Sequence, residues 1–247
     1  MDFNIGDVVT RKSHNHDCEF IVAKVNKEKR VAVLKGKCIR LNADAPFDDL
    51  EISDKRTSSD LPSLVLPRYE PNTIFGKILH IDGDSSFLKK CMDLYKYYHV
   101  PAIGYYFPES DIPQVINELL AKHKPDVLVI TGHDAYSNSP FAAQYMNSQS
   151  FLNATKNARL FQPSKDAMPI VVGGCQSDFK ALIEYSNFAS SPGRVNIGAL
   201  DPAIIAVMIS MTAVNEFVDV LRAANQTAGK TRGITGIDTR GVARKIY

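Results

Sequence analysis

The chain contains two short apolar runs of the same design, Asp126-Val-Leu-Val-Ile-Thr-Gly-His133 and Pro169-Ile-Val-Val-Gly-Gly-Cys175. Continuous apolar runs of this length, bounded by turn residues, are typical of buried strands. Each run passes through glycine to a reactive side chain, an imidazole in one and a thiol in the other. The runs therefore predict two buried strands that present chemistry at their carboxyl ends.

From Lys77 onward, the pattern alternates between strand and helix. We expect, in chain order, a strand over residues 78–81, a helix over 87–98, a strand over 100–107 and a helix over 112–123. The two runs above come next, and a helix over 178–185, a strand over 194–197 and a long helix from 202 follow the second run. Such βα alternation predicts an α/β fold with a mostly parallel sheet and helices on both faces. Ligands bind at the carboxyl edge of such a sheet, where His133 and Cys175 are expected.

Residues 1–55 have a different sequence pattern, in which short apolar and polar runs alternate. They predict a small antiparallel β-barrel of SH3-like size, with a hairpin turn over 26–30. Residues 56–72 are rich in Ser, Asp and Pro and are expected to be a linker. The α/β domain then spans 73–247 and ends in a basic C-terminal tail.

The composition excludes several function classes. A formal net charge of +2 makes no case for nucleic acid or membrane as the main partner. The N-terminus lacks the pattern of a signal peptide, and the apolar-rich stretch over 203–214 is too short to span a bilayer, which predicts a cytoplasmic protein. Four cysteines, Cys18, Cys38, Cys91 and Cys175, suit a reducing compartment as free thiols. No cofactor or metal is expected.

His133 and Cys175 together suggest nucleophilic catalysis. Either residue alone has an ordinary interpretation, as a turn histidine or a buried structural cysteine. A general base and a thiol at the ends of neighbouring strands are what a cysteine peptidase requires. A helix N-terminus after Cys175 would favour the thiolate, and the backbone N–H groups of Asp134 and Cys175 are the predicted oxyanion hole.

This arrangement resembles that of the caspase, legumain and gingipain cysteine peptidases, whose catalytic His and Cys also follow two strands. The 42 residues between His133 and Cys175 are close to the roughly 50 of caspases. Over nearly the whole chain, the sequence is more similar to the YabG family of sporulation-specific cysteine peptidases. The segments that carry this resemblance are residues 6–13, 35–36, 41–46, 79–84, 131–134 and 172–177.

The resemblance implies a caspase-like fold and a cysteine endopeptidase of the mother cell in a sporulating bacterium. Its protein substrates would be spore coat and coat-assembly proteins, cut after Arg or Lys, and it would also cut itself. His133 and Cys175 match the catalytic pair. One residue departs from the caspase pattern, because Asp134 stands where that group usually has glycine after the His.

Cleavage after basic residues needs an acidic group in the substrate pocket. The turn after the first strand of the α/β domain carries Asp82 and Asp84, which would pair with arginine or lysine, and caspase-like peptidases bind the substrate residue from this turn. The alternative is that these side chains only cap the following helix. Asp201 is a weaker candidate, because Asp before Pro is common at helix starts.

Other readings stay open. A non-enzymatic receiver-like or flavodoxin-like binding domain would use Asp82 and Asp84 as an ion or phosphate site. A class I glutaminase is disfavoured because no histidine follows His133. His14, His16, Cys18 and Cys38 are zinc-type residues with no recognised spacing, and residues 1–55 hold equal numbers of basic and acidic side chains, which favours a protein-docking role over nucleic acid.

Self-cleavage in an arginine-directed peptidase requires accessible basic residues. Arg159 is a candidate if the segment between the two catalytic strands is a mobile loop. The basic residues of the tail, Lys230, Arg232, Arg240, Arg244 and Lys245, are further candidates.

Overall fold

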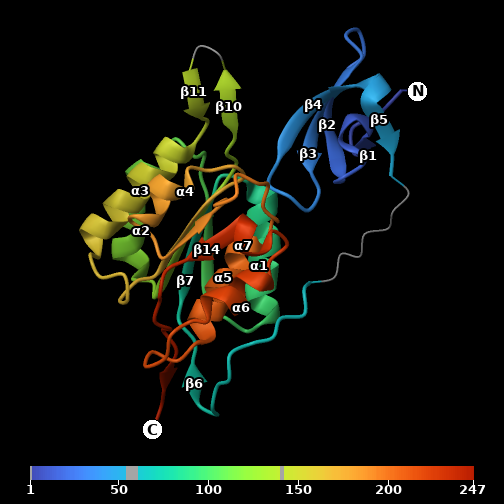
Figure 1. Ribbon diagram of the computed structural model, residues 1–247. Helices are drawn as coiled ribbons and strands as arrows, with labels where there is room; N and C mark the ends of the chain where they lie inside the picture. The colour runs from blue at the N-terminus through green and yellow to red at the C-terminus, as the bar shows by residue number, and fades with distance from the viewer. Residues whose placement is uncertain (1, 54–60, 140–141) are drawn as a thin grey trace. The chain divides into compact units, whose positions relative to one another are not determined.

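The structure is a computed structural model that describes residues 2–53, 61–139 and 142–247 (Figure 1). The chain divides into two compact units, Met1–Pro62 and Ser63–Tyr247. Within the described residues, no helix combines the length and apolar character needed to cross a membrane.

The first unit is a five-stranded antiparallel sheet in the order β4-β3-β2-β1-β5. Its strands are β1 (Val8–Arg11), β2 (Phe20–Asn26), β3 (Val31–Gly36), β4 (Asn42–Pro46) and β5 (Leu50–Ile52), with short 3-10 helices at Lys12–His14 and Phe47–Asp49. Alternate residues along the strands point into a core that includes Phe3, Phe20 and Phe47. The predicted hairpin turn over 26–30 is confirmed, since β2 ends at Asn26 and β3 begins at Val31.

The second unit is built on a six-stranded sheet in the order β14-β13-β12-β9-β7-β8. The strands are β7 (Ile78–Asp82), β8 (Ala102–Tyr106), β9 (Val127–Thr131), β12 (Ile170–Gly173), β13 (Phe188–Ser190) and β14 (Ile234–Gly236). The first five in the chain are parallel, and β14 is antiparallel to β13. The predicted α/β fold with a mostly parallel sheet is therefore confirmed.

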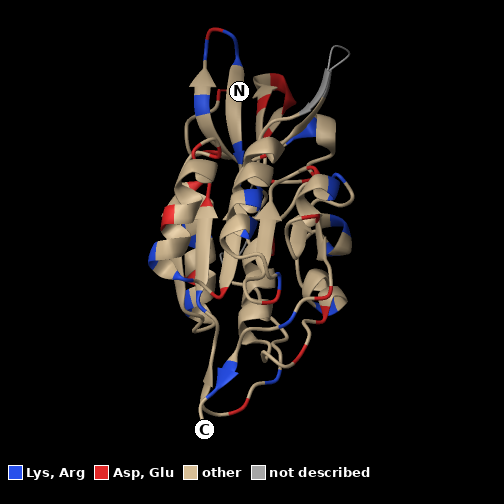
Figure 2. Cartoon of the chain, turned by 90° about the vertical axis from the view of Figure 1, so that its left-hand side faces the viewer, with Lys and Arg blue, Asp and Glu red and all other residues tan. Residues whose placement is uncertain are grey.

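Helices cover both faces of this sheet (Figure 1). One face carries α2 (Ile112–His123), α3 (Ser148–Phe161) and α4 (Phe179–Ile183), and the other carries α1 (Ser85–Tyr97) and α5 (Asp201–Met211), with α6 (Val220–Asn225) and α7 (Lys230–Gly233) near β14. Figure 2 shows that charged residues gather on the helices and loops and are sparse along the central strands. The strands are thus buried on both faces, which explains their continuous apolar runs.

Successive residues of β7 face opposite layers. Leu79 and Ile81 belong to the core beneath α2 and α3. His80 points to the α1 side, where it contacts Tyr95 of α1. Asp82 is in phase with His80, so the strand carries two buried polar side chains on one face.

Two expectations about local structure were wrong. Residues 148–161 form α3 rather than a mobile loop. The strand expected over 194–197 is absent, and β13 at Phe188–Ser190 takes its place in the sheet. The chain leaves extended geometry directly after β13, because Ser191 and Arg194 both have positive φ and Pro192 lies between them.

The basic tail is structured. It includes α7, β14 and β15 (Arg244–Lys245), and β15 pairs with β6 (Thr73–Ile74). Arg244 forms an ion pair with Asp126, and Lys245 with Glu70. A further hairpin, β10 (Tyr136–Ser139) with β11 (Ala142–Tyr145), follows the loop after β9.

Candidate active site

The loops that follow β9 and β12 run side by side at the carboxyl edge of the sheet. The last paired residues of these parallel neighbours are Thr131 and Gly173. Beyond them, Gly174 packs so closely that a Cβ there would lie 2.7 Å from the carbonyl oxygen of Gly132 and 3.0 Å from the nitrogen of Asp134. Only glycine allows this approach of two backbones, and it brings the loops that carry the His and the Cys together.

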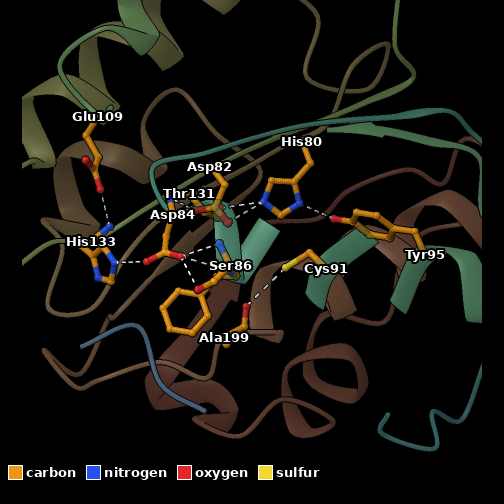
Figure 3. Close-up of polar contacts among 11 residues, drawn as sticks. His80, Asp82, Asp84, Ser86, Cys91, Tyr95, Glu109, Thr131, His133 and Ala199 are labelled. Atoms are coloured by element: carbon orange, nitrogen blue, oxygen red, sulfur yellow. Dashed lines mark hydrogen bonds and ion pairs between the residues drawn. The ribbon is translucent and has the colours of Figure 1, made fainter. Parts of the chain in front are cut away.

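His133 is held at three points, and Figure 3 shows its contacts with Asp84 and Glu109. Its Nε2 lies 2.8 Å from Oδ2 of Asp84, its backbone N–H donates to Oε1 of Glu109 at 2.7 Å, and its carbonyl accepts from the side chain of Asn147 at 2.8 Å. The Phe87 ring lies beside the imidazole, with 5.8 Å between ring centroids. The side chain is 16% exposed, so a partly open imidazole is fixed in orientation.

Asp84 has two roles in the structure. It is the N-cap of α1, where Oδ1 accepts from the backbone N–H groups of Ser86 and Phe87 and from the Ser86 hydroxyl. Its other carboxylate oxygen contacts His133. The predicted helix cap is therefore present, and the same carboxylate orients the histidine, which leaves Asp84 only 7% exposed.

Asp82 lies one layer deeper and is fully buried. Its Oδ1 accepts the backbone N–H of Asp84 at 2.9 Å, and its Oδ2 lies 3.4 Å from Nε2 of His80. The carboxylate thus supports the turn that carries Asp84 from within the protein.

His80, which no sequence motif had indicated, is the centre of this buried network. Its Nδ1 lies 2.9 Å from the Tyr95 hydroxyl, and its Nε2 lies 2.7 Å from Oγ1 of Thr131 (Figure 3). A chain of contacts therefore runs from Tyr95 through His80, Asp82 and Asp84 to His133. The signal was in the sequence, because His80 and Asp82 interrupt an apolar strand at alternate positions, which places both on one face.

One group of metal-type side chains occurs among the residues that the structure describes. Ligand atoms of His80, Asp82 and Cys91 all lie within 4.8 Å of one another. Both ring nitrogens of His80 already have hydrogen-bond partners, and the Cys91 thiol donates to the carbonyl of Ala199 at 3.5 Å. These contacts fit a closed polar network better than a metal site.

The candidate zinc residues of the first unit do not form such a group within the described residues. His16 contacts the Thr10 hydroxyl through Nδ1 at 2.7 Å, and His14 contacts the Ser13 hydroxyl at 2.8 Å. Their contacts are local to the loop that follows β1.

Cys175 lies directly after Gly174 at the end of β12 and is fully buried. Its Sγ accepts the backbone N–H of Ile197 at 3.3 Å, and the next residue, Gln176, donates its N–H to the carbonyl of Val195 at 3.2 Å. The structure thus places the thiol at the expected strand end and covers it with a segment of the loop between β13 and α5.

Asp134 joins the two loops through its side chain, a role that its position after His133 did not suggest. Oδ1 accepts the backbone N–H groups of Ala135 and Asn147, each within 3 Å. Oδ2 accepts the hydroxyl of Ser177 at 2.8 Å and that of Ser148. The carboxylate therefore fixes the loop after β9 to the loop after β12.

Glu109 is a further residue that sequence reasoning missed. It follows β8 and lies against the main chain of two turns, since a Cβ on Gly83 or Gly132 would lie 2.2 Å or 2.6 Å from its Oε1. Its carboxylate accepts the N–H of His133, and the residue is partly exposed. Among the acidic groups next to His133, Glu109 is more accessible than Asp82 and Asp84.

Two other predicted residues have structural roles instead. Arg159 is 9% exposed within α3, and burial lowers its pKa to about 10. Its guanidinium donates to five neutral oxygens, which belong to Gln162, Ser164, Met168, Tyr185 and Asn187. The expectation that Arg159 is an accessible self-cleavage site was wrong, because the residue lies buried in α3 and its guanidinium is held by these hydrogen bonds.

Asp201 is also buried and accepts the backbone N–H groups of Gly198, Ala228 and Gly229. It holds the start of α5 against the segment before α7. These hydrogen bonds explain why the Asp201 carboxylate is buried, and a role in substrate binding is not needed to explain it.

The whole chain is similar to known proteins of one kind. The family described as YabG peptidase U57 matches residues 4–70 and 67–247. The sporulation-specific protease YabG of Bacillus subtilis (strain 168) is 37% identical over 283 residues, which cover 99% of this chain and 97% of that protein. No solved structure matches the chain.

Proposed function

The chain belongs to the YabG peptidase family, and on this premise we propose that it is a sporulation protease of the cysteine type, with Cys175 as nucleophile and His133 as general base. The observation that carries the proposal is the contact between the loops after β9 and β12, where Gly174 lies against Gly132 and Asp134. Two reactive side chains separated by 42 residues thereby share one edge of the sheet.

In the proposed mechanism, Asp84 accepts Nε2–H of His133 and so sets the tautomer in which Nδ1 is the base. Nδ1 takes the proton of the Cys175 thiol, and the thiolate attacks the carbonyl carbon of the scissile bond. The imidazolium, stabilised by Asp84, then gives its proton to the leaving amine. Water hydrolyses the thioester and restores the thiol.

The predicted oxyanion hole consists of the backbone N–H groups of Asp134 and Cys175. The rigidity of this region supports the proposal, since the Asp134 carboxylate accepts hydrogen bonds from the Ser177 hydroxyl and from the backbone N–H groups of Ala135 and Asn147. Donors fixed before the reaction stabilise a developing charge without reorganisation.

We propose cleavage after Arg or Lys, with the acidic group drawn from this same edge. Asp82 and Asp84 remain the predicted substrate-binding residues, although Asp82 is fully buried and Asp84 is occupied by His133. Glu109 joins them as a candidate because it is partly exposed beside His133. A carboxylate at this edge would form a charge-assisted pair with the basic side chain of the substrate.

Further parts of the proposal follow from the family. The substrates would be spore coat and coat-assembly proteins in the mother cell, and the enzyme would also cut itself. The caspase-like arrangement of the second unit and the SH3-like barrel in the first unit stay predictions. The first unit would dock protein substrates.

A second catalytic pair has one observation in its favour, which is the proximity of His80 and Cys91. Both side chains are fully buried, and the thiol is bonded to Ala199. Cys175 is buried as well, but it follows the glycine turn at the carboxyl edge of the sheet, where His133 is partly exposed, so we favour His133 and Cys175.

The proposal is tested with peptides that differ only in the residue before the scissile bond. We expect turnover of the arginine and lysine peptides by wild type and loss of turnover in Cys175→Ala and His133→Ala. Cys91→Ala is the matched control and keeps activity. Turnover that survives Cys175→Ala but is lost in Cys91→Ala would transfer the chemistry to the buried pair, and turnover of non-basic peptides alone would overturn the specificity.

A further inference from the structure

The thiol of Cys175 lies against the end of a short segment, Arg194–Ile197, which we call the covering segment. Its last residue donates a backbone N–H to Sγ at 3.3 Å, and the carbonyl of Val195 accepts the N–H of Gln176 at 3.2 Å. Cys175 has no exposed surface as a result. A peptide substrate can reach the thiol only after the covering segment moves.

The covering segment is held by hydrogen bonds just before and just after it. Upstream, the N–H groups of Ser191 and Gly193 donate to the carbonyls of Gly233 and Arg232 at 2.6 Å and 3.1 Å. Downstream, the N–H of Gly198 donates to Oδ2 of Asp201 at 2.8 Å, at the start of α5. Because both ends are fixed, the intact covering segment has little freedom to move away from Cys175.

Arg194 is the first residue of the covering segment and is exposed. Its φ of 50° lies in the left-handed region, which costs a residue other than glycine about 1 kcal/mol. Its guanidinium lies over the Tyr136 ring, 4.7 Å from the centroid, so the side chain is at the surface beside the base of the β10–β11 hairpin. The Arg194–Val195 bond therefore follows an accessible basic residue with a strained backbone conformation.

Building on the proposed function, we propose that the Arg194–Val195 bond is an activating self-cleavage site, cut by a second copy of this chain. The thiolate of that copy attacks the carbonyl carbon of Arg194, and the C–N bond to Val195 breaks. The Val195 amine leaves with a proton from the imidazolium of His133 in that copy. Water then adds to the thioester, which yields the Arg194 carboxylate and the free thiol.

Cleavage breaks the chain connection between Arg194 and the residues of the covering segment that contact Cys175. The new amino group on Val195 is charged at neutral pH and requires hydration, which disfavours its return to the covered position. After cleavage, the only chain connection of residues 195–197 runs through Gly198 to α5. Hydrogen bonds to Ser191, Gln176 and the Cys175 thiol are then what holds these residues in place. Access to the Cys175 thiol opens in the cleaved copy.

The test follows intact mass and peptide turnover together for wild type, Arg194→Gln, Arg194→Lys and Cys175→Ala. We expect wild type to give fragments 1–194 and 195–247, and to turn over a basic peptide after a lag that shortens as the protein concentration rises. Arg194→Gln stays intact at this bond and keeps the initial slow rate, whereas Arg194→Lys is still cut. Cys175→Ala is cut only after wild type is added. Full activity of wild type or Arg194→Gln with residues 194 and 195 still joined overturns the inference.

A second measurement does not depend on peptidase activity. Limited trypsin treatment nicks wild type after Arg194 but not Arg194→Gln, and alkylation of Cys175 by iodoacetamide is then followed by peptide mass. We expect roughly tenfold or faster alkylation in nicked wild type, while the buried Cys91 stays slow in both proteins. Equal alkylation rates overturn the covering role. Faster alkylation with no turnover of any basic peptide would reject the proposed function and leave the covering role standing.

Discussion

Nε2 of His133 lies 2.8 Å from Oδ2 of Asp84, a residue 49 positions earlier in the chain. The same carboxylate caps α1 through the N–H groups of Ser86 and Phe87. The orientation of the imidazole is therefore tied to the start of a helix that packs against the sheet. This shared use of one carboxylate makes it possible to separate catalysis from stability by mutation.

Asp84→Asn is expected to lower kcat by roughly 10²–10⁴-fold, because an amide no longer stabilises the imidazolium or sets its tautomer. Its thermal stability should stay near that of wild type, since Asn caps a helix about as well as Asp. Peptide turnover and thermal denaturation measure the two effects.

Two variants accompany this test. Asp84→Ala removes the cap as well, at a cost of about 1 kcal/mol. Asp93→Asn changes an exposed carboxylate on the same helix and should leave kcat unchanged. Wild-type kcat in Asp84→Asn would exclude Asp84 as the orienting residue.

His80→Leu is expected to destabilise the protein by roughly 2–4 kcal/mol, because Asp82, Tyr95 and Thr131 lose a partner inside the core. Denaturant unfolding followed by circular dichroism measures the change. His99→Asn, at an exposed position, is the control. An unfolding midpoint equal to that of wild type would mean that water or another side chain replaces the imidazole.

Gly132 and Gly174 are expected to differ in how their substitution can be repaired. A Cβ on Gly132 meets the flexible Glu109 side chain, whereas a Cβ on Gly174 meets the backbone of Gly132 and Asp134. Glu109→Ala should therefore restore stability to Gly132→Ala but not to Gly174→Ala. A double-mutant cycle on the free energy of unfolding measures this coupling, and equal rescue of both variants would contradict the packing described here.

Arg159→Met is expected to destabilise the fold by roughly 2–4 kcal/mol, since five oxygens lose their donor, two of them in buried hydrogen bonds. Burial lowers the Arg159 pKa to about 10, so its loss of charge adds stability only as the pH rises above that value. The destabilisation should thus be constant between about pH 6 and pH 9. Unfolding of Asn153→Met, at an exposed position of α3, provides the comparison, and a cost that varies across this range would contradict the assignment.

Ser13→Ala is expected to raise the pKa of Asp49. Partial desolvation alone would raise this pKa, but the backbone N–H and hydroxyl of Ser13, together with the nearby charges of Arg11 and His14, hold it below 3.8. The stabilisation is therefore present above pH 3.8 and is lost as the pH falls through the lower pKa of the folded state. A carboxyl NMR titration of the variant measures the shift. Ser53→Ala, whose hydroxyl bonds Glu19, should leave the Asp49 titration unchanged.

The parallel sheet could be predicted from sequence because its strands are continuous apolar runs, as in β9 and β12, that end at glycine. The helix over residues 148–161 was missed although it is well formed. Its first turn carries Ser, Gln and Ser, and its buried Arg159 breaks the apolar stripe. The strand expected over 194–197 was wrong because an apolar pattern cannot reveal two positive φ angles around a proline.

The sequence by itself determined the class of fold, the strand ends that carry His133 and Cys175, and the family, because these depend on local patterns and on motifs. Only the tertiary structure decided the contacts among Asp84, Glu109 and His133 and the covering of Cys175 by Ile197. These contacts join residues between 22 and 49 positions apart. Such contacts depend on strand order and on glycines that let two main chains touch, and neither can be read from local periodicity.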